Sequence, residues 1–143
     1  MSDNVYLGNP NLKKANTPIE FTEENVIEFV KCKNDPVYFA RKYIKIVSLD
    51  EGLVPFNMYD FQEKLIDRFH KNRFNICKMP RQTGKSTTCI SYLLHYAVFN
   101  DNVNIAVLAN KASTARDLLG RLQLAYENLP SWMQQGIISW NKG

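Results

Sequence analysis

Two apolar runs, each followed by a helical pattern, constrain the fold of this chain most strongly. Phe74–Met79 is a short strand candidate, and Val103–Ala109 is a second, more continuously apolar one. Helical spacing of apolar residues follows each run, at 85–99 and at about 113–128. Strand, helix, strand, helix in this order is typical of a parallel sheet with right-handed crossovers. The sequence therefore predicts an α/β fold with a parallel sheet flanked by helices.

An N-terminal helical segment is expected before this unit. Thr22 followed by two glutamates predicts a helix start, because a threonine caps the first amides and acidic groups favour that end of the helix dipole. Asp35-Pro36 predicts a second start, with proline at the first helical position. A third helix is expected over 60–71. Residues 1–20 are polar and lack periodicity, so we expect an arm that is loose or draped over the domain.

The remaining segments give weaker signals. Gly52–Pro55 is expected to break the chain between helices. Ile137–Trp140 is expected to begin a further strand, after which the pattern is incomplete. Residues 21–143 are therefore interpreted as the N-terminal portion of one domain.

Charge and cysteine content limit the class of protein. The net charge is +4, with 18 basic against 14 acidic residues and a pI near 9.0. This excess is compatible with a nucleic-acid partner, but the basic stretches 31–45 and 68–81 fit solvated helix faces and a loop equally well. The three cysteines show no metal-ligand spacing, and Cys77 and Cys89 are expected to be small buried side chains. No run is long enough for a membrane span, so an intracellular protein is predicted.

The segment between the first strand and its helix carries the clearest chemical signal. Residues 79–86 are Met-Pro-Arg-Gln-Thr-Gly-Lys-Ser, and their end matches the phosphate-binding (Walker A, or P-loop) pattern G-x-x-x-x-G-K-[ST], with Met79 in place of the first glycine. Gly84 permits close backbone approach to phosphate oxygens, and amides of 83–87 would point at them from a helix N-terminus. Lys85 would bind the β and γ phosphates, and Ser86, or less favourably Thr87, would offer a hydroxyl to Mg²⁺.

Two further residues have both a functional and an ordinary interpretation. The guanidinium of Arg81 would reach a γ-phosphate as an arginine finger supplied in cis, or it lies on an exposed turn. The amide of Gln62 would pair with the edge of adenine, or it is a solvated helix residue. The predicted nucleotide-binding residues are Gln62, Gln82, Thr83, Gly84, Lys85, Ser86 and Thr87.

The combination of these motifs resembles the ATPase front end of tailed-phage large terminases, most closely the T-even myovirus type. The likeness rests on residues 59–62 (Tyr-Asp-Phe-Gln), 80–87, 107–111 and 129–143, in this order, and it spans the chain from about Phe21 onward. Terminases commonly depart from the strict pattern at the position of Met79. The resemblance implies a partial P-loop NTPase fold, part of a DNA-packaging motor whose nuclease domain is absent here.

The resemblance also implies roles and partners. Gln62 would read adenine, Arg81 would be the cis arginine, and Lys85 would bind phosphate. Residues 109–111 would couple the nucleotide, ATP with Mg²⁺, to movement of double-stranded DNA. Implied partners are the portal protein, the small terminase subunit and the remaining part of the large terminase, in the host cytoplasm and transiently at the procapsid portal, without a membrane.

The acidic residues argue for a different behaviour of the isolated chain. After Lys85 the carboxylates are Asp101, Asp117 and Glu127, and none forms an acidic pair at the end of an apolar strand. ATPases of this class need one carboxylate for Mg²⁺ and another for the attacking water. We therefore expect little or no ATP turnover by this chain alone. A non-catalytic nucleotide-binding or assembly module is one alternative, and a helicase-like remodelling ATPase is another.

Overall fold

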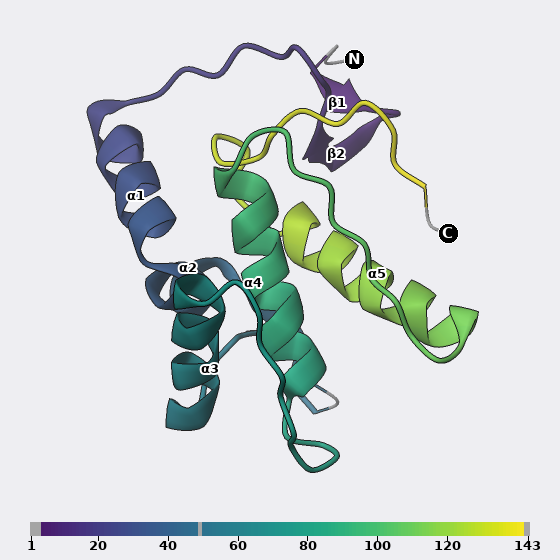
Figure 1. Ribbon diagram of the computed structural model, residues 1–143. Helices are drawn as coiled ribbons and strands as arrows, with labels where there is room; N and C mark the ends of the chain where they lie inside the picture. Colours follow the sequence, from purple (N-terminus) through teal and green to yellow (C-terminus); the bar gives the residue numbers. More distant parts are fainter. Residues whose placement is uncertain (1–3, 49, 142–143) are drawn as a thin grey trace.

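The fold is built around a central helix. The computed structural model describes residues 4–48 and 50–141. α4 (Lys85–Phe99) stands in the middle, with α2 (Pro36–Tyr43) and α3 (Asp60–Lys71) on one side and α5 (Ala112–Glu127) on the other (Figure 1). α1 (Glu23–Asn34) packs against α2. These five helices form one body whose middle is α4.

The predicted helices are confirmed, and their starts have the expected caps. The hydroxyl of Thr22 accepts a hydrogen bond from the Asn25 amide at 3.2 Å. The Asp35 carboxylate accepts one from the Tyr38 amide at 2.8 Å, with Pro36 at the first helical position. Each cap satisfies an amide that has no partner within its helix. The local sequence therefore determines where these two helices begin.

The predicted parallel sheet is wrong for the described residues. Their strands form two separate antiparallel pairs, β1 (Val5–Tyr6) with β2 (Asn9–Lys13) and β3 (Lys45–Ser48) with β4 (Gly52–Pro55). Neither pair involves 74–79 or 103–109. The predicted strand at 137–140 is reduced to one isolated parallel bridge between Ile137 and Lys14. The structure is therefore a small α/β fold of five helices and two short hairpins, and a partial P-loop fold is not shown.

The two expected core strands fail for lack of a partner. Residues 73–79 and 103–110 make no backbone–backbone hydrogen bond with any described part of the chain. In 103–107 alternate side chains are half-buried, as the apolar pattern predicts. This pattern indicates which side chains are buried, but it does not indicate whether the backbone pairs with another strand. Both segments are therefore unpaired strand-like sequences.

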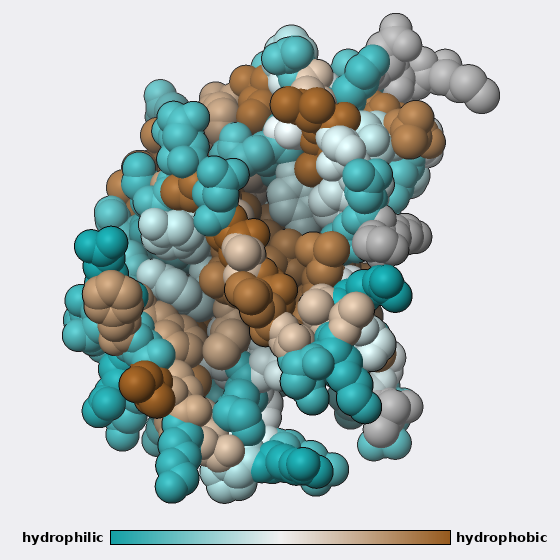
Figure 2. Space-filling model, turned by 45° about the vertical axis from the view of Figure 1, so that its right-hand side comes forward, coloured by the Kyte–Doolittle hydropathy of each residue, from teal (hydrophilic) through white to brown (hydrophobic). Residues whose placement is uncertain are grey.

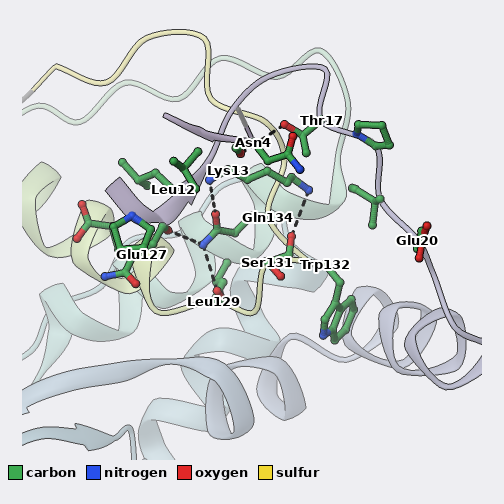
Figure 3. Close-up of a pocket in the computed structure, with 15 residues that line it drawn as sticks. Asn4, Leu12, Lys13, Thr17, Glu20, Glu127, Leu129, Ser131, Trp132 and Gln134 are labelled. Carbon is green, nitrogen blue, oxygen red and sulfur yellow. Dashed lines mark hydrogen bonds between the residues drawn. The ribbon is translucent and has the colours of Figure 1, made fainter. Parts of the chain in front are cut away.

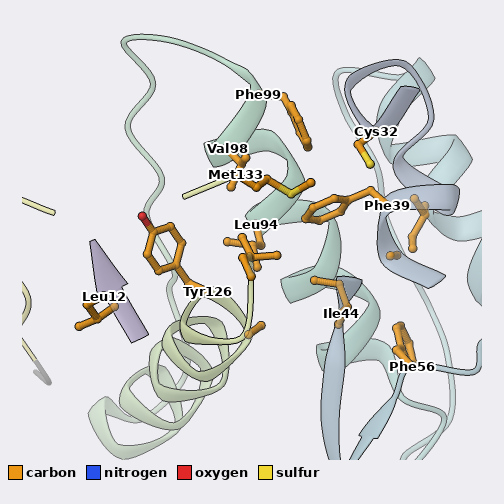
Figure 4. Close-up of a cluster of buried hydrophobic side chains, with 14 residues drawn as sticks. Leu12, Cys32, Phe39, Ile44, Phe56, Leu94, Val98, Phe99, Tyr126 and Met133 are labelled. Carbon is orange, nitrogen blue, oxygen red and sulfur yellow. The ribbon is translucent and has the colours of Figure 1, made fainter. Parts of the chain in front are cut away.

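A hydrophobic core lies on the inner faces of the helices. Leu94, Val98 and Phe99 of α4 meet Phe39 of α2 on one side and Tyr126 of α5 on the other (Figure 4). Phe39 and Leu94 are at most 1% exposed. Burial of this apolar surface is the main source of stability.

A buried amide side chain helps attach the N-terminal hairpin to the far end of the chain, beside the backbone bonds of Ile137 with Lys13 and Ala15. The side-chain oxygen of Gln134 accepts from the Lys13 amide at 3.1 Å, and its nitrogen donates to the Asn11 carbonyl at 2.9 Å and to the Leu129 carbonyl at 3.1 Å (Figure 3). Leu12 between them is 1% exposed. Residues 4–20 are therefore draped over the helices. Of the two arrangements expected for this arm, loose or draped over the domain, the second is found.

One carboxylate joins α1 to α2. Glu28 accepts hydrogen bonds from the Tyr38 hydroxyl at 3.0 Å, the Tyr43 hydroxyl at 2.9 Å and the Lys42 ammonium at 2.8 Å. Partial desolvation by itself raises the pKa of Glu28, but the hydrogen bonds from Lys42, Tyr43 and Tyr38 outweigh it and lower that pKa from 4.5 to about 2. The charged form of Glu28 thus stabilises the folded state.

This network predicts a pH-dependent effect of Glu28→Gln. Because the folded-state pKa is depressed, the contribution of Glu28 is present above pH 4.5 and is lost as the pH falls towards 2. We expect the variant to be less stable at pH 7 by about 1–2 kcal/mol, after allowing for solvent screening, and the difference to vanish near pH 2. Urea unfolding of both proteins at pH 7, 4 and 3 measures it. A difference independent of pH would contradict this role.

The cysteines only partly follow expectation. Cys32, Cys77 and Cys89 are all free thiols. Cys89 is half-buried, but Cys77 is exposed, because it lies in the unpaired 74–79 segment; its predicted burial was wrong. Across the described ranges, every helix is too short or too polar to cross a membrane.

Candidate phosphate-binding loop

The backbone between 80 and 84 forms a tight loop that ends at the N-terminus of α4. Gln82 has a φ of 61°, and Gly84, the N-cap, has a φ of 72°, so both occupy the left-handed region. The first amide of the helix with a backbone acceptor is that of Thr88, which donates to the Gly84 carbonyl at 2.9 Å. Among the described residues, the amides of 85–87 have neither a backbone nor a side-chain acceptor. Three donors at the positive end of a helix of 15 residues are available to an anion.

The Lys85 side chain folds back into this loop. Its Nζ donates to the Met79 carbonyl oxygen at 3.2 Å and also to the Pro80 carbonyl oxygen. The Thr83 hydroxyl donates to the same Pro80 carbonyl at 3.0 Å. The ammonium therefore lies beside the carbonyls of the loop and next to the unpaired amides of α4. Positive charge and amide donors are concentrated at one point of the surface.

Gln62 connects α3 to the loop. Its side chain is 4% exposed; its nitrogen donates to the Thr83 carbonyl at 3.3 Å, and its oxygen accepts from the Tyr59 amide at 3.0 Å. The interpretation of Gln62 as a solvated surface residue is therefore wrong. Its amide positions the loop and retains one N–H and one lone pair for another partner. Whether this partner is adenine stays a prediction.

Gly84 is the position in the loop that tolerates substitution least. A Cβ there would collide with the side-chain nitrogen of Gln62, and the φ of 72° is unfavourable for any other residue. We expect Gly84→Ala to destabilise the fold by about 1–2 kcal/mol from the backbone alone, with a further loss from the collision. Thermal unfolding with circular dichroism measures the sum.

Two variants separate the causes. Gly120→Ala is the matched control, because a Cβ on this helical glycine of α5 meets nothing within 4 Å; we expect it to be stabilising by about 0.5–1 kcal/mol. The double variant Gly84→Ala with Gln62→Ala removes the collision but not the backbone strain, so its loss should be smaller than the sum of the two single losses. If Gly84→Ala proved as benign as Gly120→Ala, the described loop geometry would be refuted.

The other predicted residues take different places. Ser86 is exposed in the first turn of α4, where its hydroxyl is accessible from solvent, and Thr87 is half-buried. Arg81 and Gln82 are exposed. Lys85 and Ser86 line a cavity of about 270 Å³, but Arg81 does not line it. The structure thus brings Lys85, Ser86 and Gln62 to the loop, while the proximity of Arg81 to the same cavity is not shown.

Sequence reasoning missed an aromatic pair beside Gln62. The rings of Tyr59 and Phe61 stack with centroids 5.8 Å apart and an interplanar angle of 8°, although Tyr59 is 70% and Phe61 43% exposed. Stacked rings at the surface present an apolar face on which a flat heterocycle can pack. The available signal was two aromatic residues flanking Asp60 at the start of α3.

The loop fits a divalent cation only in part. Ser86 offers one oxygen, and the cavity that it lines with Lys85 contains no carboxylate. Among the described residues, no three His, Cys, Asp or Glu side chains are close enough together to hold a metal ion. Mg²⁺ takes six oxygen ligands, several of which are commonly water and phosphate oxygens. The residues present are therefore suited to an ion that arrives with a phosphate ligand.

The sequence gives no match to any protein-family model. The resemblance to large terminases consequently rests on the motifs in residues 59–62, 80–87, 107–111 and 129–143.

Proposed function

We propose that this chain binds ATP with Mg²⁺ through the loop at 80–87. The amides of 85–87 hold phosphate oxygens, and the Lys85 ammonium moves from the loop carbonyls to the β and γ phosphates. The Ser86 hydroxyl supplies one ligand to the ion, which neutralises phosphate charge when it is bound. The roles of Gln82 and Thr83 are to shape the loop that presents these groups.

The observation that carries this proposal is the convergence of unpaired donors on one loop. Three amides at the N-terminus of α4 and the Lys85 ammonium lie together, and the left-handed Gly84 directs the backbone into the helix. Such donors are a ready site for an anion, and a triphosphate satisfies more of them than a single carboxylate does. The ordinary alternative is a turn before a helix with a lysine on the surface. Such a turn would not require the Lys85 ammonium to point at the loop carbonyls, nor the positive φ of Gln82 and Gly84.

The base would bind on the α3 side of the loop. Gln62 contacts the Thr83 carbonyl, and its free N–H and lone pair match the acceptor and donor on the edge of adenine. The exposed Tyr59–Phe61 pair begins the same helix and offers a ring face to a purine. Adenine specificity is therefore assigned to Gln62, and stacking to the aromatic pair.

The biological setting comes from the resemblance. Within a large-terminase ATPase, ATP bound here would power translocation of double-stranded viral DNA into procapsids, with the portal protein, the small terminase subunit and the rest of the large terminase as partners. Arg81 would then act in cis on the γ-phosphate, and residues 109–111 would transmit the nucleotide state. These assignments are part of the proposal.

A second candidate function, nucleotide binding without turnover, is favoured by one observation. The cavity lined by Lys85 and Ser86 contains no carboxylate to orient the ion or the attacking water. Since hydrolysis of this type depends on such a group, the chain by itself is expected to retain ATP. Assembly with a polypeptide that supplies carboxylates would convert binding into turnover.

A titration of the chain with ATP, ADP and AMP in the presence of Mg²⁺ tests the proposal. We expect affinity to rise from AMP to ATP by about tenfold for each added phosphate, because each adds a charge-assisted contact. Phosphate release should stay at background. Equal affinity for AMP and ATP would rule out phosphate binding by the loop, and rapid phosphate release would rule out the second candidate.

A further inference from the structure

Three adjoining cavities surround the unpaired segment 73–79 and form one groove along α4. Their volumes are about 610, 270 and 900 Å³. The first and second share Leu65 and Cys77, and the second and third share Cys89 and Leu93. The groove continues to Val107 in the second unpaired segment. We call it the α4 groove. Figure 2 shows that apolar surface gathers near the middle of one face of the molecule, bordered by hydrophilic surface.

The rims of the α4 groove expose apolar side chains and main chain together. Phe74 is 83% exposed, Ile76 101% and Leu108 88%. The backbones of 73–79 and 103–110 have no backbone partner among the described residues. Exposed apolar side chains on an extended, unpaired backbone are the features that bind another extended chain.

The charges around the α4 groove all have one sign. Five basic residues line it, and no aspartate or glutamate is among its lining residues. The basic residues are Arg68, Lys71, Arg73, Lys78 and Lys85. Lys71 already pairs with Asp67 at 2.8 Å and Lys85 donates to the loop carbonyls, so Arg68, Arg73 and Lys78 form the basic rim that is open to a partner. A partner that neutralises this charge must be acidic.

We infer that the α4 groove binds an extended segment of a partner protein in which apolar residues alternate with acidic ones. Apolar side chains of that segment cover Leu65, Leu93 and Val107, and its carboxylates pair with the basic rim. Its main chain supplies both N–H donors and C=O acceptors to the unpaired backbones. A nucleic-acid strand satisfies the charge but fits less well, since phosphodiesters provide acceptors only and the unpaired carbonyls need donors. The α4 groove adjoins the proposed phosphate-binding loop, since Lys85 and Ser86 line its 270 Å³ cavity. The peptide contacts named here involve neither residue and do not require a bound nucleotide.

Fluorescence anisotropy with labelled synthetic peptides tests the inference on the whole chain. The first peptide has eight residues in which valine alternates with glutamate. The second has lysine in place of glutamate and tests the charge. The third is the first peptide with N-methylated amides and tests the main-chain hydrogen bonds. We expect a Kd on the order of 10 µM for the first and at least about tenfold weaker binding of the other two. Labelled oligo-dT of 20 nucleotides is the competing ligand.

Matched variants locate the site. Ile76→Lys should weaken the first peptide at least about tenfold, because it puts a charge where an apolar side chain packs. Ile138→Lys, at a residue 86% exposed and outside the groove lining, should change nothing. Lys78→Glu should weaken the glutamate peptide and favour the lysine peptide, whereas Lys64→Glu on the exposed side of α3 should not.

Three outcomes would overturn the inference. The first is saturable binding of oligo-dT, sensitive to Ile76→Lys, with no peptide binding. The second is peptide binding that Ile76→Lys and Ile138→Lys reduce equally. The third is self-association of the chain, seen by sedimentation and abolished by Ile76→Lys, which would make a second copy the occupant. Loss of ATP binding in Lys85→Ala tests the proposed function, whereas the responses of peptide binding to Ile76→Lys and Lys78→Glu, both outside the loop at 80–87, test the groove. Failure of either idea is therefore recognisable separately.

Discussion

Lys85→Ala is expected to weaken ATP binding by at least about a hundredfold. The Lys85 ammonium is the only cation whose Nζ lies within hydrogen-bond distance of the loop carbonyls in the described chain. Two charge-assisted contacts to phosphate, at about 1.5–3 kcal/mol each, correspond to a factor of this size or larger. Calorimetric titration with ATP and Mg²⁺ measures it directly.

The controls for Lys85→Ala separate charge from shape. Lys85→Arg keeps the charge but replaces a compact ammonium with a broad planar group, so we expect it to rescue little. Lys64→Ala removes an exposed lysine from α3 and should leave ATP affinity unchanged. Both variants must retain the far-ultraviolet circular dichroism of the parent. ATP affinity that falls less than about threefold in Lys85→Ala would exclude this side chain from the site.

Phe39→Ala is expected to have the largest effect on stability, a loss of about 3–5 kcal/mol in the free energy of unfolding. Phe39 is 0% exposed and sits where α2 faces α4. Its ring centroid lies 5.4 Å from those of both His95 and Phe99, edge-on, and 6.0 Å from that of Tyr43. Truncation removes these contacts and leaves a cavity between two helices.

Guanidinium unfolding at 25 °C measures this loss. Phe74→Ala is the matched control: the same truncation at a ring 83% exposed should change stability by no more than about 0.5 kcal/mol. A loss below about 1 kcal/mol in Phe39→Ala would mean that α2 and α4 do not meet as described.

The helices could be predicted from the sequence because their signals are local. Thr22 and Asp35 each cap amides three residues away, and Pro36 fixes the first turn of α2. Such contacts depend on a few neighbouring residues, so they survive in any tertiary setting. The start of α4 was also predictable from a local signal, the Gly84-Lys85-Ser86 pattern, although Gly84 has no side chain to cap the helix.

The strands could not be predicted in this way, because a strand needs a partner. The apolar patterns at 74–79 and 103–109 are typical of strands, yet no described segment forms backbone hydrogen bonds with either of them. Conversely, the prediction that Gly52–Pro55 is a break between helices was wrong, because these residues form β4, which begins at Gly52 with a φ of 73° and pairs with β3. Whether a segment pairs is decided by the rest of the molecule.

The candidate site was predictable in its loop and not in its surroundings. Gly84, Lys85 and Ser86 occupy one turn because they are adjacent in sequence. The contact of Gln62 with Thr83 spans 21 residues and depends on how α3 packs on α4. The role of Gln62 towards adenine stays a prediction, and the burial of its amide and the Tyr59–Phe61 stack could not be predicted without the structure.

The central claim, that the amides at the start of α4 bind phosphate, is tested most directly by amide chemical shifts. With ¹⁵N-labelled chain, addition of ATP and Mg²⁺ should move the resonances of residues 83–87 most, and AMP should move them far less. ATP binding at saturation that leaves the amides of Lys85, Ser86 and Thr87 unmoved would contradict the proposed site.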